Sequence, residues 1–282
     1  MNAVSIDAGP LLVVQSGKGP TILLVHGVAG SHRIFDPIVP LLETDFSVVR
    51  VDLLGYGHSA KPRAAYTPEV HSRAIHDSLE ASGIAGPFIL LGLSMGVDVV
   101  LDYAARYPGE VADIIGVGFP YYRDRDEACR GVRANLFTGF TVDHPALASI
   151  LIPLVWAVGR SVSPLARKMA TIYTPVMARE TMMCRFLAFK RSLLNTMIEN
   201  RLEGVLAASG DRRRLFVHGG ADKWCAESDV RTALEQYPRT VFEVIDGAAH
   251  NLVVLEPERL VSLIRAYLGT ELAPVSEPPV TS

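Results

Sequence analysis

The feature that most constrains the fold is a series of short apolar runs in the first half of the chain, alternating with helix-like segments. Each run is rich in β-branched residues and is bounded by turn residues. Strands that are apolar on both faces and alternate with helices indicate a mostly parallel sheet covered by helices on both sides. The runs are "TILLVHG" (21–27), "FSVVRVD" (46–52), "PFILLGLS" (87–94) and "VADIIGVGFP" (111–120), and helices are expected in "EVHSRAIHDSLEASG" (69–83) and "MGVDVVLDYAARYP" (95–108).

The alternation stops after Pro120 and resumes near residue 213. The stretch between, 121–210, has no strand-like run, is helical in pattern and is rich in methionine and proline. We interpret it as a helical cap inserted into the sheet domain. The later elements are a strand in "RRLFVHGG" (213–220), a helix near 227–237, a strand in "TVFEVID" (240–246) and a last helix near 257–268.

The expected domain organisation follows from this interruption. Residues 1–120 and 211–270 form one α/β core, and 121–210 form the cap. The tail 271–282 is rich in proline and is expected to be disordered.

Composition excludes several classes of protein. A net charge of −3 and a pI of about 6.2 argue against a nucleic-acid binder, which needs a concentrated basic surface. The 3 cysteines are an odd number without metal-ligand spacing, so we expect a reducing, cytoplasmic location and no bound metal. The longest apolar stretch, 146–158, contains Pro153 and is too short to span a membrane.

Two glycine-rich stretches resemble nucleotide-binding motifs but lack their context. In "SGKGPT" (16–21), Gly19 follows the lysine where a phosphate loop requires serine or threonine. In "GYGHSA" (55–60), the pair Lys61-Pro62 follows at once, so no helix opens there to hold a pyrophosphate. Both stretches are expected to be turns, and no cofactor is predicted.

The stretch "GLSMG" (92–96) fits the G-x-S-x-G pattern of a nucleophile elbow around Ser94. An apolar strand precedes it and an amphipathic helix follows it, as the motif requires. Glycines two residues on either side let the strand and helix pack closely around a strained serine. The start of the helix directs amide groups at charge that develops near this side chain. Ser94 is therefore predicted to be a nucleophile.

A nucleophilic serine needs a base, and His250 is the candidate. It lies in "VIDGAAHNLVV", after the last predicted strand and before the last helix. Of the 8 histidines it alone combines a loop position at the end of a strand with a place late in the chain.

The acid that orients this histidine is best assigned to Asp222, in "VHGGADKW" just past a strand. Asp246 is a weaker candidate, because it is too close in sequence to His250 to reach around the ring. Asp124 and Asp126 follow the preceding strand and rank second.

An oxyanion hole would complete the site. "LLVHGVAGS" places His26-Gly27 at the end of a buried strand, where the backbone N–H of Val28 can turn inward. The residue after the nucleophile, Met95, supplies the second N–H. The side chain of His26 is expected to brace the loop by hydrogen bonding.

Together these motifs resemble the α/β-hydrolase superfamily. The stretches "HGVAGS", "DLLGYGHS", "GLSMG", "GGAD" and "GAAH" fall in its order, within 21–122 and 213–268. The resemblance implies an α/β-hydrolase fold and the order Ser94, Asp222, His250. "GLSMG" is similar to the elbow of enol-lactone hydrolases, and capped members include C–C hydrolases. One departure is Val97, where many members have a third glycine; it is followed by Asp98, which either reaches the site or pairs within the core.

The predicted function is hydrolysis of an ester, lactone or thioester through an acyl-enzyme on Ser94. The substrate is expected to be a small molecule with an apolar part. Two alternatives remain open: a C–C bond hydrolase with a cation in its pocket, or a small-molecule receptor with slow turnover. The oligomeric state is left open. The expected pocket walls are Trp156, Met177, Met182 and Met183, and the candidate cations are Arg123, Arg185 and Lys190.

Overall fold

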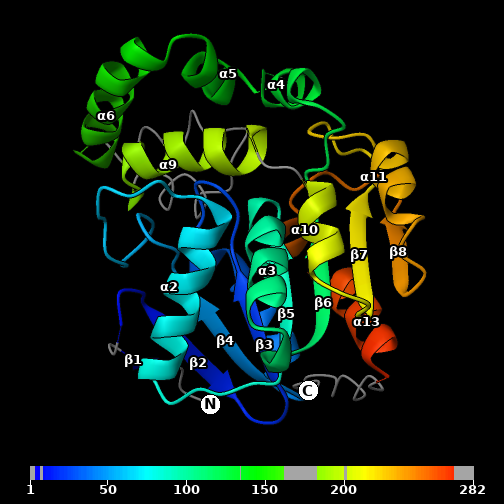
Figure 1. The fold of residues 1–282 in the computed structure, drawn as a ribbon. Coiled ribbons are helices and arrows are strands. Elements are labelled where there is room, and N and C mark those ends of the chain that lie inside the picture. Colours follow the sequence, from blue (N-terminus) through cyan, green and yellow to red (C-terminus); the bar gives the residue numbers. More distant parts are fainter. Residues whose placement is uncertain (1–3, 7–8, 134, 162–182, 200–201, 270–282) are drawn as a thin grey trace, which may run out of the picture.

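A computed structural model describes residues 4–6, 9–133, 135–161, 183–199 and 202–269 (Figure 1). Within these residues, eight strands form one sheet in the order β1-β2-β4-β3-β5-β6-β7-β8. Strand β2 runs antiparallel to both of its neighbours, and the remaining pairs are parallel. The strands are β1 (Val4–Ile6), β2 (Val13–Gly17), β3 (Thr21–Val25), β4 (Ser47–Val51), β5 (Phe88–Leu93), β6 (Val111–Val117), β7 (Arg214–Gly219) and β8 (Thr240–Ile245).

The mostly parallel sheet and its helices agree with the sequence prediction. All the predicted strands form, whereas β1 and β2 were not anticipated. The helical segments are η1 (His32–Phe35), α1 (Val39–Leu42), α2 (Pro68–Ala81), α3 (Met95–Arg106), η2 (Pro108–Glu110), α4 (Arg125–Arg133), α5 (Leu136–Asp143), α6 (Pro145–Ser161), α9 (Phe186–Ser192), η3 (Leu193–Ile198), α10 (Leu202–Ala208), α11 (Glu227–Leu234), α12 (Leu252–Leu255) and α13 (Pro257–Leu268).

Two buried apolar clusters lie on opposite faces of the sheet. Successive residues of a strand point to opposite faces, so Leu23 of β3 joins one cluster and Leu24 joins the other. Helices α2, α3 and α11 cover the first face, and α1, α12 and α13 cover the second (Figure 1). All six residues of the central strand β5 are buried, as expected for a strand covered on both sides.

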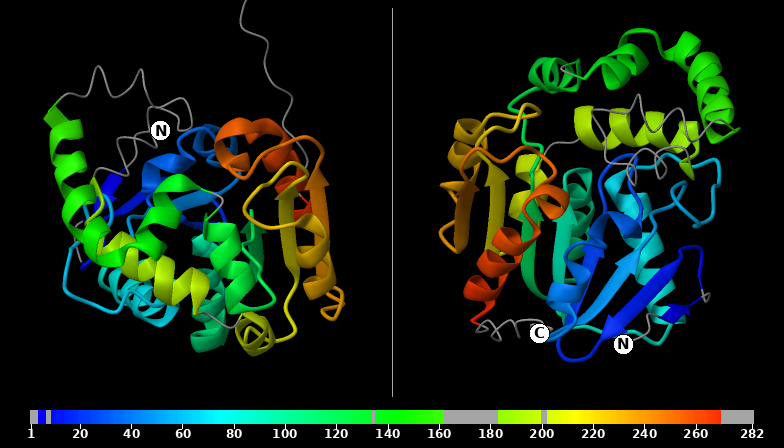
Figure 2. Two further views of the ribbon diagram at one scale, coloured as in Figure 1. Left: turned by 90° about the horizontal axis from the view of Figure 1, so that it is seen from above. Right: turned by 180° about the vertical axis from the view of Figure 1, so that it is seen from behind.

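Helices α4, α5 and α6 form an arch beyond the carboxyl ends of the parallel strands, with α9 beneath it (Figure 2). Helix α9 contributes Phe186 and Phe189 to the first apolar cluster, which ties it to the sheet domain. Helix α10, also within 121–210, packs beside α3 at the side of the sheet (Figure 1). Residues 121–210 therefore contact the core at more than one place.

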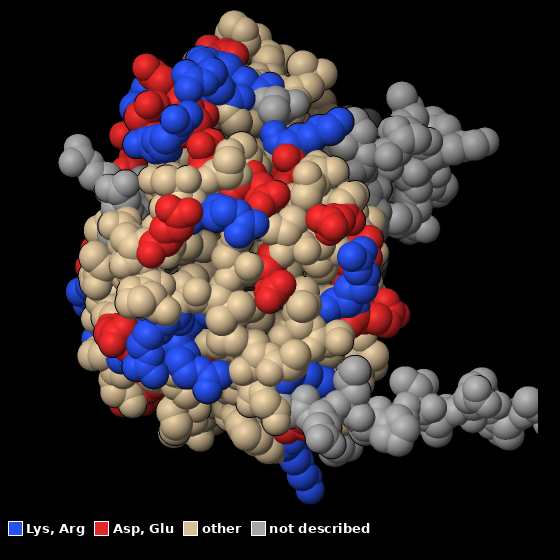
Figure 3. Space-filling model, turned by 90° about the vertical axis from the view of Figure 1, so that its right-hand side faces the viewer, with Lys and Arg blue, Asp and Glu red and all other residues tan. Residues whose placement is uncertain are grey.

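The surface and the helix lengths bear on possible partners. On the face shown in Figure 3, basic and acidic side chains are interspersed. Among the residues that the structure describes, no helix combines the length and the apolar character needed to cross a bilayer. The predicted tail 271–282 lies outside the described residues.

Candidate active site

The elbow around Ser94 forms where β5 ends and α3 begins. Ser94 has a φ of 52° and a ψ of −126°, which is a strained conformation for a residue with a side chain. A Cβ on Gly92 would lie 2.5 Å from the carbonyl oxygen of Gly96, and one on Gly96 would lie 2.2 Å from that of Val25. Both positions therefore require glycine, because the helix crosses the strands too closely for any side chain.

Three of the predicted residues meet at this elbow. The Oγ of Ser94 lies 2.9 Å from Nε2 of His250. The Nδ1 of the same ring lies 2.7 Å from Oδ2 of Asp222. Only the carboxylate can accept at Oδ2, so Nδ1 carries a proton and Nε2 is free to accept from the serine hydroxyl. The chain brings these groups together across 156 residues of sequence.

Asp222 follows β7, and its side chain is fully buried. Its Oδ1 accepts from the backbone N–H of Trp224 at 2.8 Å. Burial alone would raise the pKa of this carboxyl, but the hydrogen bond and charge of His250 outweigh it and hold the pKa below its ordinary value. The structure thus holds Asp222 as a carboxylate facing the imidazole.

The other candidate acids have different contacts. Asp124 accepts from the backbone N–H of Glu127 at 2.8 Å, which caps the start of α4. Asp126 and Asp246 are exposed. Of the carboxylates considered from the sequence, Asp222 is the one bonded to His250.

His250 is held in the loop between β8 and α12. A Cβ on Gly118, which has a φ of 60°, would lie 3.1 Å from the carbonyl oxygen of His250. The indole of Trp224 packs beside the imidazole, with ring centroids 5.7 Å apart. The ring is therefore fixed from the side of β6 and from the loop that carries Asp222.

The loop after β3 runs directly beside the elbow. A Cβ on Gly27 would lie 3.0 Å from Cβ of Ser94, so the backbone at this point approaches the serine closely. Val28 follows in a turn that is closed by a bond from the Gly30 N–H to the Gly27 carbonyl. Met95 is the first residue of α3, where amide groups have no acceptor within the helix.

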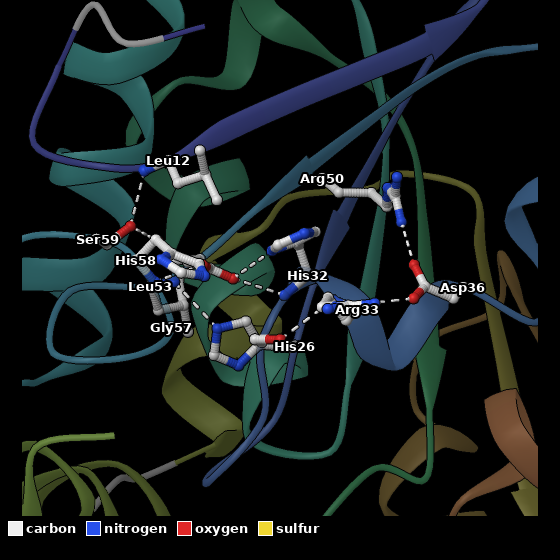
Figure 4. Close-up of polar contacts among 12 residues, drawn as sticks. Leu12, His26, His32, Arg33, Asp36, Arg50, Leu53, Gly57, His58 and Ser59 are labelled. Atoms are coloured by element: carbon white, nitrogen blue, oxygen red, sulfur yellow. Dashed lines mark hydrogen bonds and ion pairs between the residues drawn. The ribbon is translucent and has the colours of Figure 1, made fainter. Parts of the chain in front are cut away.

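His26 braces this loop, as expected from the sequence. Its Nε2 accepts from the backbone N–H of Leu53 at 3.0 Å, and its Nδ1 donates to the carbonyl of Gly27 at 2.7 Å. Burial lowers the pKa of His26 from 6.5 to about 4, against the opposing charge of Asp52. The ring is neutral and ties the loop after β3 to the loop after β4 (Figure 4).

Asp52 anchors the stretch "DLLGYGHS", in which residues 55–59 form the turns predicted for "GYGHSA". Its buried carboxylate accepts from the N–H and the Nδ1 of His32 and from the N–H of His58, at 2.7, 2.8 and 2.8 Å. Burial would raise the pKa of Asp52, but the hydrogen bonds from His32 and the charges of His32 and His26 hold this pKa well below its ordinary range. This corner is a structural support for the loops around the elbow.

Sequence reasoning missed a cluster behind the triad. His218 of β7 and Cys225 lie with Asp222 so that one ligand atom from each falls within 4.8 Å of the others. The spacing of the cysteines from one another gives no metal signal, because that criterion overlooks a mixed set of ligands. The spacing His-x₃-Asp-x₂-Cys after a strand was the available signal.

The predicted pocket residues are described only in part. Trp156 lies on α6, although its side chain is outside what the structure describes, and Met177 and Met182 lie outside the described residues altogether. Met183 is half-buried at the start of the segment that leads into α9.

The candidate cations of the pocket bond to other partners. Arg123 pairs with Glu127 at 2.9 Å and is 65% exposed. Arg185 donates to the carbonyl of Lys61, and Lys190 donates to that of Pro145.

Comparison with known proteins agrees with this architecture. A family model described as "alpha/beta hydrolase fold" matches residues 20–128. Lipase 1 of Psychrobacter immobilis is 37% identical over 118 residues, which cover 40% of this chain and 37% of the lipase. The chain spans less than half the length of the first curated relatives it matches.

Solved structures resemble the chain over nearly its whole length. The structure of E-2-(acetamidomethylene)succinate hydrolase aligns with a TM-score of 0.75 and 19% identity, covering 95% of this chain and 99% of the other. The enol-lactonase of Burkholderia xenovorans LB400 aligns with a TM-score of 0.70 and 17% identity, covering 95% and 100%. The resemblance to the α/β-hydrolase superfamily is therefore confirmed, and the chain has the α/β-hydrolase fold.

Proposed function

We propose that this protein is a serine hydrolase that cleaves an ester, lactone or thioester of a small, partly apolar molecule. One observation carries the proposal: the 2.9 Å contact from Ser94 to His250, continued by the 2.7 Å contact from His250 to Asp222. A hydroxyl, an imidazole and a buried carboxylate in this sequence of contacts suit acyl transfer. The names of relatives, a lipase and an enol-lactonase among them, agree with carbonyl substrates of this kind.

The proposed reaction starts with attack of Ser94 Oγ on the substrate carbonyl. Nε2 of His250 takes the hydroxyl proton, and Asp222 holds the ring in the required tautomer and stabilises its positive charge. The tetrahedral intermediate then collapses, and the same proton passes to the leaving oxygen or sulfur. Water, deprotonated by His250, attacks the acyl-enzyme, releases the acid and restores the serine.

Stabilisation of the oxyanion is assigned to the backbone N–H groups of Val28 and Met95. The close approach of Gly27 to Ser94 supports this role for the loop after β3. Met95 begins α3, so its free amide and the positive end of the helix dipole favour negative charge beside Ser94. This chemistry needs no metal or organic cofactor.

We further propose a domain arrangement that places the substrate between two parts of the chain. Residues 1–120 and 211–270 supply the core, 121–210 act as a helical cap, and 271–282 are a tail outside both. Ligands of open α/β sheets bind beyond the carboxyl ends of the strands, which is where α4, α5 and α6 lie (Figure 1). The apolar walls of the pocket are assigned to the cap residues Trp156, Met177, Met182 and Met183.

The test is covalent labelling combined with turnover. Purified protein is treated with a fluorophosphonate, and the adduct is located by mass spectrometry. Turnover is measured with p-nitrophenyl esters, lactones, thioesters and a vinylogous diketone. We expect the adduct on Ser94 and a loss of roughly 10⁶-fold in Ser94→Ala, because triad members act as a unit.

Ser149→Ala is the matched control, since Ser149 is exposed on α6 and its hydroxyl donates to Pro145 and accepts from Lys190, with no contact to the triad. This variant should keep full turnover and full labelling. An adduct on a serine other than Ser94, or turnover that survives in Ser94→Ala, would disprove the assignment. Faster cleavage of the diketone than of every ester would instead identify a C–C hydrolase, and labelling with negligible turnover would indicate a receptor.

A further inference from the structure

Next to Asp222 lie two side chains that the proposed reaction does not use. His218 points from the end of β7, and Cys225 follows Asp222 in the loop before α11. Their ligand atoms and those of Asp222 all fall within 4.8 Å of one another. An imidazole, a carboxylate and a thiol thus converge from one strand and the loop that follows it.

His218 has an unusual environment for a buried polar side chain. It is 1% exposed, and neither ring nitrogen makes a hydrogen bond of good geometry among the residues that the structure describes, although the backbone of Cys225 lies close to the ring. Its Nε2 instead faces Oδ2 of Asp222 at 3.7 Å, beyond hydrogen-bonding distance. Buried imidazoles are normally bonded, so this ring is oriented toward the carboxylate without a bond to satisfy it.

The three ligand types are those that zinc prefers. Tetrahedral zinc binds histidine nitrogen, carboxylate oxygen and cysteine sulfur at about 2.0–2.3 Å, which places neighbouring ligand atoms about 3.3–3.8 Å apart. A nitrogen and an oxygen ligand lie about 3.3–3.5 Å apart in this geometry. The 3.7 Å between Nε2 of His218 and Oδ2 of Asp222 is close to that separation. Cys225 donates to the carbonyl of Phe119 at 3.0 Å, and binding of the metal would replace this hydrogen bond.

We propose that His218, Asp222 and Cys225 form an inhibitory binding site for Zn²⁺. The inhibitory role rests on the proposed function of Asp222, whereas the binding itself does not. The ion bonds to a ring nitrogen of His218, to Oδ2 of Asp222 and to the thiolate of Cys225, and a water molecule fills the fourth position. The thiol proton leaves to solvent, and no electrons are transferred.

The inhibition follows from the sharing of one oxygen atom. Oδ2 of Asp222 is the acceptor for Nδ1 of His250 at 2.7 Å, and it is also the oxygen nearest to His218. A cation bound to this oxygen neutralises the carboxylate charge that faces His250 and competes with His250 for the oxygen. The histidine then loses the group that fixes its tautomer, as in loss of the acid from a catalytic triad.

Binding is measured first, without turnover. Full-length protein is titrated with Co²⁺, and the cobalt–thiolate charge-transfer absorption is followed; Zn²⁺ then displaces the cobalt. We expect the band in wild type and its absence in Cys225→Ser. Cys129→Ser is the matched control, because Cys129 and Cys225 are each 7% exposed and Cys129 lies on α4. The control should bind as wild type does.

A second variant keeps the test valid if Cys225→Ser folds poorly. His218→Gln leaves the thiol in place, so the band should persist while the affinity for Zn²⁺ falls roughly tenfold or more. In turnover assays, Zn²⁺ should inhibit wild type and Cys129→Ser reversibly, and a chelator should restore the rate. Cys225→Ser should need roughly tenfold or more additional Zn²⁺ for the same inhibition.

The outcomes separate this proposal from the proposed function. Ser94→Ala should show the full cobalt band, so the metal site can be tested even if the protein hydrolyses none of the substrates. No thiolate band in wild type, or an equal band in Cys225→Ser, would refute the site. Zn²⁺ binding that leaves the rate of an active enzyme unchanged would refute the inhibitory role.

Discussion

Two buried aspartate–histidine pairs lie close to the elbow, and they have nearly the same contact distance and the same burial. Asp52 contacts His32 at 2.8 Å, and Asp222 contacts His250 at 2.7 Å. Both carboxylates are fully buried, and the two histidines are 14% and 12% exposed. Each acid follows a strand of the same sheet, β4 in one case and β7 in the other. The pair alone therefore does not make a catalytic site.

The difference lies in what each pair is bonded to. Asp52 also receives the backbone N–H groups of His32 and His58, so its bonds hold two loops in place. Asp222 receives one backbone N–H, from Trp224, and its histidine reaches Ser94. Backbone donors fix a chain, whereas a histidine between an acid and a hydroxyl can move a proton. We therefore expect the first pair to determine stability and the second to determine rate.

The largest expected effect is on the rate, in Asp222→Asn. The amide donates where the carboxylate accepts, which favours the wrong tautomer of His250 and should lower kcat about 10⁴-fold. Turnover with p-nitrophenyl acetate and a thermal melt measure the two quantities together. A rate within tenfold of wild type would assign the acid to another residue.

The converse substitution, Asp52→Asn, should act mainly on stability. It removes a buried charge from three donors, so the free energy of unfolding should fall by about 3 kcal/mol. The rate per folded molecule should change by less than roughly tenfold, because Asp52 touches none of the three triad residues. Urea unfolding and active-site titration measure these effects. A stable variant with a rate as low as that of Asp222→Asn would abolish the distinction between the pairs.

A smaller effect concerns buried histidines that have no carboxylate bonded to them. Burial lowers the pKa of His71 from 6.5 to about 3. The unfolded chain therefore binds a proton at mildly acidic pH that the folded chain excludes, and stability is complete above pH 6.5 and falls as the pH drops toward 3. At pH 5 the loss from this one group is about 2 kcal/mol.

His71→Phe tests this acid-induced loss of stability, because phenylalanine keeps an aromatic ring between Tyr56 and Tyr66 but cannot bind a proton. Urea unfolding at pH 7.5 and pH 5 should show a smaller acid-induced loss in the variant than in wild type. His76→Phe is the control, because His76 is on the same helix and pairs with Glu110. Equal acid sensitivity in wild type and His71→Phe would show that folding does not lower the pKa of His71.

Much of the fold was predictable, and its exceptions have physical causes. Parallel strands such as β5 are apolar on both faces, so a short run is enough to recognise them. Strand β1 has three residues, and β2 contains both buried and half-buried positions, so neither has that continuous pattern. Both are stabilised by antiparallel pairing at the edge of the sheet, which depends on residues distant in sequence.

The sequence by itself determined the elbow and the order of the candidate site residues. Positions 92 and 96 require glycine, because the backbone at these points leaves no room for a Cβ. The same holds for the positions of His250 and Asp222 after strands, since parallel strands end at a common edge. These features are local or follow from the order of the strands.

Only the tertiary structure decided which aspartate meets His250 and which histidines stay structural. Asp222 contacts the ring, whereas Asp246 is exposed, although Asp246 is nearer to His250 in sequence. The same packing puts His218 and Cys225 behind the acid, where no spacing rule had brought them together. Side-chain direction and burial are set by contacts between distant segments, so the sequence lists the groups but not their partners.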